Sequence, residues 1–87
     1  MRGYTVQFES RVEKDLRAIP LDIAERLIAR AIALGEDPFA PGTVKLKGET
    51  SYRVRVGEYR IVFDVDTGAH LVSVLAVGHR GDIYRKR

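Results

Sequence analysis

The chain has 87 residues, of which 45% are hydrophobic and 31% are charged, with a net charge of +3 and no cysteine. This size and mixture predict one small folded domain over residues 1–87, and they exclude a disordered chain, a disulfide framework and a thiolate metal site. No signal-peptide pattern opens the chain and no apolar stretch approaches membrane-spanning length, so we expect a cytoplasmic protein without a membrane partner.

The positive excess lies in the second half of the chain. Residues 43–87 carry nine Lys and Arg against five Asp and Glu, whereas residues 1–42 carry six against seven. We therefore expect the second half to face any polyanionic partner. The alternative is a solvated basic surface that only keeps the protein in solution, and charge alone does not decide between the two.

The first half of the chain predicts a strand followed by a helix. Residues 3–10 (GYTVQFES) alternate between apolar and polar side chains, which is typical of a half-buried strand. Ser10 and Glu13 have the spacing of a capping box, with Ser10 as the N-cap. The helix that follows presents one apolar face, made of Val12, Leu16 and Ile19. Pro20 ends this helix and opens the next.

A second helix is indicated by apolar residues at helical spacing, and Gly35 is its expected C-terminal stop. Its apolar residues are Ile23, Leu27, Ile28, Ala31 and Leu34. The two helices are expected to form a helical hairpin with one apolar side. The segment EDPFAPG then reads as a loop.

The second half of the chain predicts four strands. They are a short strand in residues 43–48, two strands in residues 51–65 and a last strand in residues 69–78 that Gly78 ends. The order β-α-α-β-β-β-β predicts an α+β fold: a small, mostly antiparallel twisted sheet with the helical hairpin packed on one side.

Residues 51–65 (SYRVRVGEYRIVFDV) predict a hairpin whose register can be derived. Gly57 and Glu58 fit a two-residue turn of type II′, with glycine first. The turn pairs Val56 with Tyr59, Arg55 with Arg60, Val54 with Ile61, Arg53 with Val62 and Tyr52 with Phe63. The apolar side chains then share the face toward the helices, and Arg53, Arg55 and Arg60 share the other face.

Arg55 opposite Arg60 indicates a phosphate-binding surface. Like charges directly opposite each other destabilise a sheet, so folding alone gives no reason for this pair. An arginine fork matches the geometry of phosphate oxygens. Lys45 and Lys47 share a parity in the preceding strand and are expected to extend the patch. The alternative is that these charges only protect the sheet, although mixed signs would do that equally well.

The tail GHRGDIYR adds four candidates that would lie beside the arginines if the tail crosses the sheet: His79, Arg80, Tyr84 and Arg85. Histidine can move protons near neutral pH, and tyrosine can stack on a base. Each is also compatible with an ordinary surface or tail-anchoring role. His70 and His79 lack a carboxylate pattern, so we expect no metal, and no motif indicates a cofactor. Asp64 and Asp66 are interpreted as turn residues.

The segments KLKG, YRVRVGEYRIVFDVD and VLAVGHRGDIYR together resemble the RelE/ParE superfamily of toxins from prokaryotic type II toxin–antitoxin systems. The resemblance covers nearly the whole chain and implies the RelE-like fold. Members that resemble RelE are endoribonucleases that cut mRNA, without metal, in the decoding site of the small ribosomal subunit. Members that resemble ParE inhibit DNA gyrase. The tail with its tyrosine is more similar to the RelE side.

The resemblance also implies roles for residues of this chain. Arg53 and Arg55 match the basic pair that grips phosphate. From strand parity and the charge of the tail rather than from the resemblance, we expect Lys45, Lys47 and Arg85 to make further RNA or ribosome contacts. Arg60 and Arg80 match the arginines that stabilise charge at the cut site. Tyr84 matches the tyrosine that stacks on the base there.

One departure from the family concerns the general base. Some relatives hold lysines where this chain holds Arg53 and Arg55, and arginine stays protonated, so it is a poor base. His79 is therefore the first candidate for the base and Tyr84 the second.

The resemblance further implies a cognate antitoxin that covers or distorts the basic face. Two alternatives to an mRNA endonuclease stay open at this point. One is a gyrase inhibitor that is not a nuclease, and the other is a relative that binds RNA and cleaves it weakly or not at all.

Overall fold

The computed structural model describes residues 3–46 and 50–79. The elements in chain order are β1 (Thr5–Phe8), α1 (Ser10–Arg17), α2 (Leu21–Ala33), β2 (Val44–Lys45), β3 (Tyr52–Val56), β4 (Tyr59–Asp66) and β5 (Leu71–His79). This is the β-α-α-β-β-β-β order that the sequence predicts, so the α+β fold class is confirmed.

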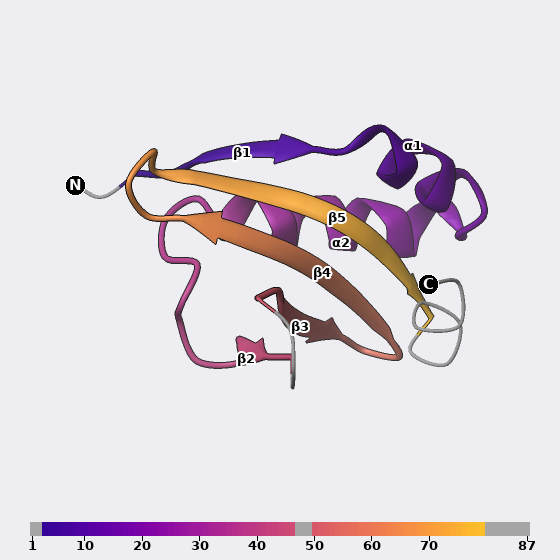
Figure 1. Cartoon of the computed structure of the whole chain (residues 1–87). Coiled ribbons are helices and arrows are strands. Elements are labelled where there is room, and N and C mark those ends of the chain that lie inside the picture. The colour runs from indigo at the N-terminus through magenta and orange to yellow at the C-terminus, as the bar shows by residue number, and fades with distance from the viewer. Residues whose placement is uncertain (1–2, 47–49, 80–87) are drawn as a thin grey trace.

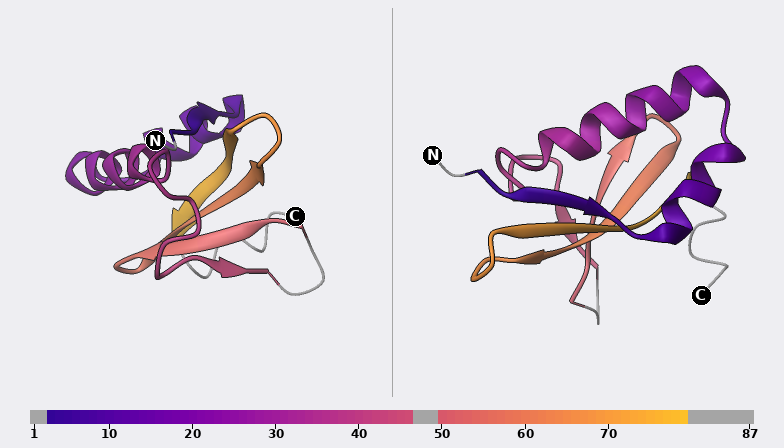
Figure 2. Two further views of the ribbon diagram at one scale, coloured as in Figure 1. Left: turned by 90° about the vertical axis from the view of Figure 1, so that its left-hand side faces the viewer. Right: turned by 90° about the horizontal axis from the view of Figure 1, so that it is seen from above.

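The strands form one twisted five-stranded sheet in the order β1-β5-β4-β3-β2 (Figure 1). The pairs β2–β3, β3–β4 and β4–β5 are antiparallel, and β1 runs parallel to β5. The first strand of the chain therefore lies beside the last one, at the edge opposite β2. The two helices lie on the same side of the sheet (Figure 2), so no helix of residues 3–46 and 50–79 covers its other face.

The hydrophobic core lies between the helices and the inner face of the sheet. Helix α1 contributes Val12, and α2 contributes residues at the spacing of one helical face. The buried residues of the core cluster are Val12, Leu27, Ala31, Leu34, Val54, Ile61, Phe63, Val72, Val74 and Val77. Ile28, which the sequence groups with this face, lies at its margin with 36% of its surface exposed.

The predicted capping box at Ser10 is wrong. Helix α1 begins at Ser10 itself, and its N-cap is Glu9, which makes no side-chain capping bond. The reason is that β1 runs directly into the helix. Glu9 stays extended and donates its N–H to the Val74 carbonyl, while its own carbonyl accepts the N–H of Val12. Pro20 does precede α2 as its N-cap, as the sequence predicts.

Gly35 follows the end of α2, but its structural role is a close approach. A Cβ at this position would lie 2.9 Å from the Tyr4 carbonyl oxygen and 3.1 Å from Val6 Cγ2. The Gly35 carbonyl also accepts the N–H of Tyr4. Glycine therefore lets the end of α2 pack directly against the start of β1.

The last strand does not end at Gly78, contrary to the prediction. Its partner β4 begins at Tyr59, directly after the hairpin turn, and β5 pairs with β4 as far as that residue. Gly78 therefore pairs with Arg60, and His79 pairs with Tyr59. A register shift between Val62 and Phe63 marks a β-bulge. Within the residues that the structure describes, no helix has the length and apolar character needed to cross a membrane.

Candidate nucleic-acid interface

The hairpin of β3 and β4 has the register that the sequence predicts. Gly57 has a φ of +61°, and Glu58 is not a positive-φ residue, which is the pattern of a type II′ turn. All five predicted pairs occur: Tyr52–Phe63, Arg53–Val62, Val54–Ile61, Arg55–Arg60 and Val56–Tyr59.

The pairing separates the hairpin into two chemically different faces. Val54, Ile61 and Phe63 are buried on the helix side. Because successive residues of a strand point to opposite faces, Arg53, Arg55 and Arg60 share the side away from the helices. We call these three residues the arginine face. Arg55 is exposed and the other two are half-buried, with the Nε of Arg60 shielded from solvent.

The arginine face concentrates positive charge within a short distance. Directly opposite residues of an antiparallel pair have Cβ atoms about 4.5–5.5 Å apart, which applies to Arg55 and Arg60. Among residues 3–46 and 50–79, the structure shows no ion pair for Arg53 or Arg55. Two arginine side chains that start from directly opposite positions are long enough to reach one phosphate together.

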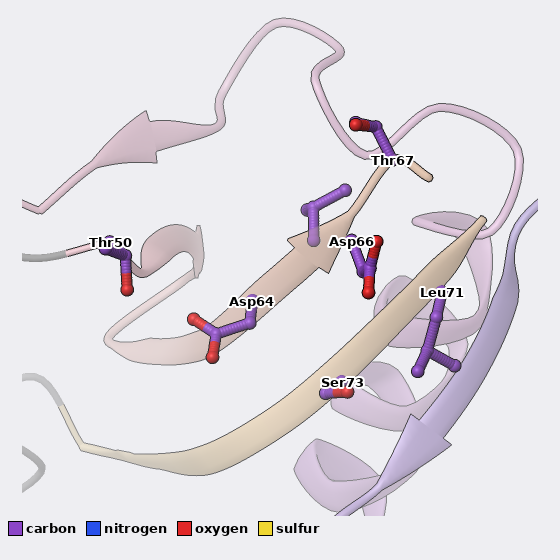
Figure 3. A pocket seen from close by; sticks show the side chains of 7 residues that line it. Thr50, Asp64, Asp66, Thr67, Leu71 and Ser73 are labelled. Atoms are coloured by element: carbon purple, nitrogen blue, oxygen red, sulfur yellow. The ribbon is translucent and has the colours of Figure 1, made fainter. Parts of the chain in front are cut away.

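The same sheet face becomes acidic at its other end. Asp64 and Asp66 share the parity of Arg60 on β4, and they pair with Ser73 and Leu71 of β5. Both aspartates line an open pocket of about 510 Å³. Figure 3 shows them there together with Thr50, Thr67, Leu71 and Ser73. Two carboxylates disfavour a phosphate there, so a polyanion on this face would be favoured at the arginine end.

The interpretation of both aspartates as turn residues is wrong for Asp64. It lies within β4, and its Oδ1 accepts a hydrogen bond of 2.9 Å from the Ser51 hydroxyl. Asp66 is the last residue of β4 and accepts the N–H of Ala69 in the following turn. The alternation of Arg60, Val62, Asp64 and Asp66 along the strand is the sequence signal that places these carboxylates on the arginine side. Among the described residues, no group of three or more His, Asp or Glu is arranged to hold a metal ion.

Lys45 does not extend the arginine face. It pairs with Tyr52, and Val44 pairs with Arg53. Directly paired residues project to the same side of a sheet, so Lys45 belongs to the parity of Tyr52, which packs against the core. The prediction failed because no two-residue turn joins β2 to β3, so the sequence did not reveal their register. Lys47 lies outside the described residues.

His79 is the last residue of β5 and lies beside the turn end of the β3–β4 hairpin, but its side chain is on the sheet side opposite the arginine face. It pairs with Tyr59, and the two rings make an edge-to-face contact with centroids 5.6 Å apart. Tyr59 packs against the core, whereas Arg60 pairs with Gly78. The residue that shares the side of Arg60 is thus Gly78, which carries no side chain. Arg80, Tyr84 and Arg85 lie outside the described residues.

Comparison with known proteins identifies the family. The family model for the ParE toxin of type II toxin–antitoxin systems (parDE) matches residues 6–84. Toxin RelG from Mycobacterium tuberculosis is 31% identical over 85 residues, which cover 95% of this chain and 98% of the relative.

Solved structures of toxins are also similar to this chain. One chain of the toxin–antitoxin complex RelBE2 from M. tuberculosis superposes with a TM-score of 0.84 at 29% identity, over 94% of this chain and 97% of the other. The archaeal RelE–RelB complex from Pyrococcus horikoshii contains a chain with a TM-score of 0.78 at 26% identity, over 93% and 98%. The chain therefore belongs to the RelE/ParE superfamily of type II toxins.

Proposed function

We propose that this toxin is a ribosome-dependent endoribonuclease that cuts mRNA in the decoding site of the small ribosomal subunit. The observation that carries the proposal is the arginine face, where Arg55 lies opposite Arg60 on the side of the sheet away from the helices. The similarity of the chain to toxin RelG and to RelE structures supports the choice of RNA cleavage as the reaction.

The proposed reaction uses the RNA's own 2′-hydroxyl as the nucleophile. Its oxygen bonds to the adjacent phosphorus and its proton passes to a general base. The bond from phosphorus to the 5′-oxygen breaks as that oxygen takes a proton from water, which leaves a 2′,3′-cyclic phosphate. Negative charge builds up on the phosphate oxygens between these steps. Arg60 and Arg80 stabilise that charge, Arg53 and Arg55 hold the flanking phosphates, and Tyr84 stacks on the base at the cut site.

His79 and Tyr84 are the two candidates for the general base, and the structure bears on only one of them. A positioned acid or base contributes about 10²–10⁴-fold to a rate, so its removal is easily measured. His79 projects on the side of Tyr59 rather than of the arginine face. We therefore propose Tyr84 as the base, and expect His79→Gln to retain most cleavage and Tyr84→Phe to lose it.

The proposal includes a cognate antitoxin that covers the arginine face. Solved relatives were crystallised as complexes of RelE with RelB, which supports a partner of this kind. Covering three arginines calls for an acidic or amphipathic segment, and such segments commonly fold as they bind. The protein without its antitoxin is then the active toxin.

The matched-charge experiment for this function compares two arginine variants in a purified translation system. Arg60→Gln removes a charge from the arginine face, whereas Arg26→Gln removes one from an exposed position of α2. We expect Arg60→Gln to lose mRNA cleavage by at least about 10²-fold, in line with loss of a charge-stabilising group, and Arg26→Gln to cut like the wild type. Equal activity of both variants would contradict the proposal.

A second candidate function is inhibition of DNA gyrase. The observation that favours it is the family model, which is that of the ParE toxin. A gyrase supercoiling assay with the purified protein separates the two functions. Inhibition of supercoiling without mRNA cleavage would select the gyrase function, and salt-sensitive RNA binding without either activity would select an RNA-binding relative that does not cleave.

A further inference from the structure

Within residues 3–46 and 50–79, the C-terminal end of β5 has a strand partner on one side only. The partner β1 ends at Phe8, opposite Val74, and the Glu9 N–H to the Val74 carbonyl is the last backbone bond between the two segments. From there β5 continues to His79 with β4 alone beside it. The β-bulge separates this end of β5 from the rest of its pairing with β4, because the register shifts between Val62 and Phe63.

A side chain of α1 takes the place of the missing strand. The Asp15 carboxylate accepts the backbone N–H of Val77 through Oδ2, at 3.2 Å. Its position is held in turn by Arg11, one helical turn earlier, whose Nε lies 3.3 Å from the same oxygen. The Asp15 side chain is only 19% exposed, so this is a sheltered, charge-assisted hydrogen bond between segments 62 residues apart.

This bond is one residue away from the arginine face. Neighbouring residues of a strand direct their backbone groups to opposite edges, so Val77 faces Asp15 and Gly78 faces β4. Gly78 lies directly opposite Arg60. The position of β5 at this point therefore sets the distance between the Gly78 backbone and the arginine.

We propose that Asp15 is a positioning residue: it holds the end of β5 at Val77 and thereby fixes Gly78 beside Arg60. The effect on cleavage rests on the proposed function, whereas the bond itself does not. A carboxylate on the sheet-facing side of α1 is unfavourable for packing unless it is paired, and here its pairing holds the edge of the site.

Three variants separate this role from general stability. Asp15→Ala removes the acceptor, Asp15→Asn keeps an oxygen that can accept the Val77 N–H, and Arg11→Gln removes only the ion pair. The first readout is native-state hydrogen exchange of the Val77 amide, with the Ile61 amide in the middle of β4 as the reference.

We expect Asp15→Ala to speed Val77 exchange about 10- to 100-fold relative to Ile61, which is the range for loss of a hydrogen bond to a charged group. Asp15→Asn and Arg11→Gln should stay within a few fold of the wild type. Equal acceleration at Ile61 would mean a loss of global stability, and unchanged Val77 exchange would mean that the bond holds nothing; both overturn the proposal.

The second readout is the cleavage rate with ribosomes. We expect Asp15→Ala to lower kcat at least about 10-fold with KM nearly unchanged, and Asp15→Asn to restore it. Faster Val77 exchange with an unchanged kcat would overturn the positioning role. If the wild type itself does not cleave, the proposed function fails, and the exchange results together with the Gly78 and Arg60 amide chemical shifts decide whether Asp15 positions this end of β5.

Discussion

Removing the charge of Arg55 should stabilise the free protein. Arg55 is exposed and lies directly opposite Arg60, so Arg55→Gln removes a like-charge contact without opening a cavity. Cross-strand pairs contribute about 0.2–1 kcal/mol to the free energy of unfolding. For a domain of 60–100 residues, 1 kcal/mol shifts Tm by roughly 4–8 °C. We therefore expect Tm to rise by ~1–8 °C at low salt.

The assay is thermal unfolding at about 0.02 M and about 1 M NaCl, because the Debye length at the higher salt falls to ~3 Å, below the separation of the pair. The stabilising effect of Arg55→Gln should shrink at high salt. Arg26→Gln on α2 is the control and should change stability by less than ~0.5 kcal/mol at both salts.

The same Arg55 variant should bind RNA more weakly. The loss of one phosphate contact should reduce the slope of log affinity against log salt by about 1. Greater stability with weaker binding would mean that the arginine pair is kept for a polyanion. If Arg55→Gln destabilises the protein at low salt, or if its effect does not depend on salt, the repulsion that underlies this reasoning is absent.

Three further predictions follow from the packing and the charge pattern. Gly35→Ala should lower the free energy of unfolding by about 1–3 kcal/mol in urea, because its Cβ would lie 2.9 Å from the Tyr4 carbonyl oxygen; unchanged stability would mean that β1 and α2 can separate. Phe63→Ala should lower it by about 3–5 kcal/mol, since the ring is fully buried, and a loss below ~1 kcal/mol would contradict the core described. Asp64→Asn combined with Asp66→Asn should raise the affinity for single-stranded RNA a few fold at low salt, measured by fluorescence anisotropy, and the gain should vanish near 1 M salt; no gain at low salt would mean that RNA does not approach this face.

The hairpin could be predicted in detail because its information is local. Gly57 fixes the turn type, the turn fixes the register, and the alternation of apolar residues fixes which side faces the helices. The arginine face follows from these three steps without knowledge of the rest of the fold. The order of elements was predictable for a similar reason, since each helix and strand has its own periodicity.

Other features depend on contacts between distant segments, and the sequence did not reveal them. Lys45 was misplaced because no two-residue turn fixes the register of β2 against β3. Glu9 replaces Ser10 as the N-cap because its N–H is bound by β5. The Asp15–Val77 bond joins residues 62 positions apart and has no local signature.

His79 shows the limit of reasoning from proximity in sequence. Its position next to Arg80 suggested a shared site, but strand alternation places it on the side of Tyr59. The sequence would have indicated this side for His79 if we had expected β5 to pair with β4 beyond Gly78, because His79 then lies opposite Tyr59. The two tail residues that carry the proposed chemistry, Arg80 and Tyr84, are assigned from the family resemblance.

The most direct test of the proposed function is primer extension on an mRNA that is being translated in a purified system with the wild-type toxin, repeated on the same mRNA without ribosomes. We predict cuts within codons in the translated sample and none in the naked RNA. Cuts in both samples would mean a general ribonuclease, and the absence of cuts in both would contradict the proposed endoribonuclease activity.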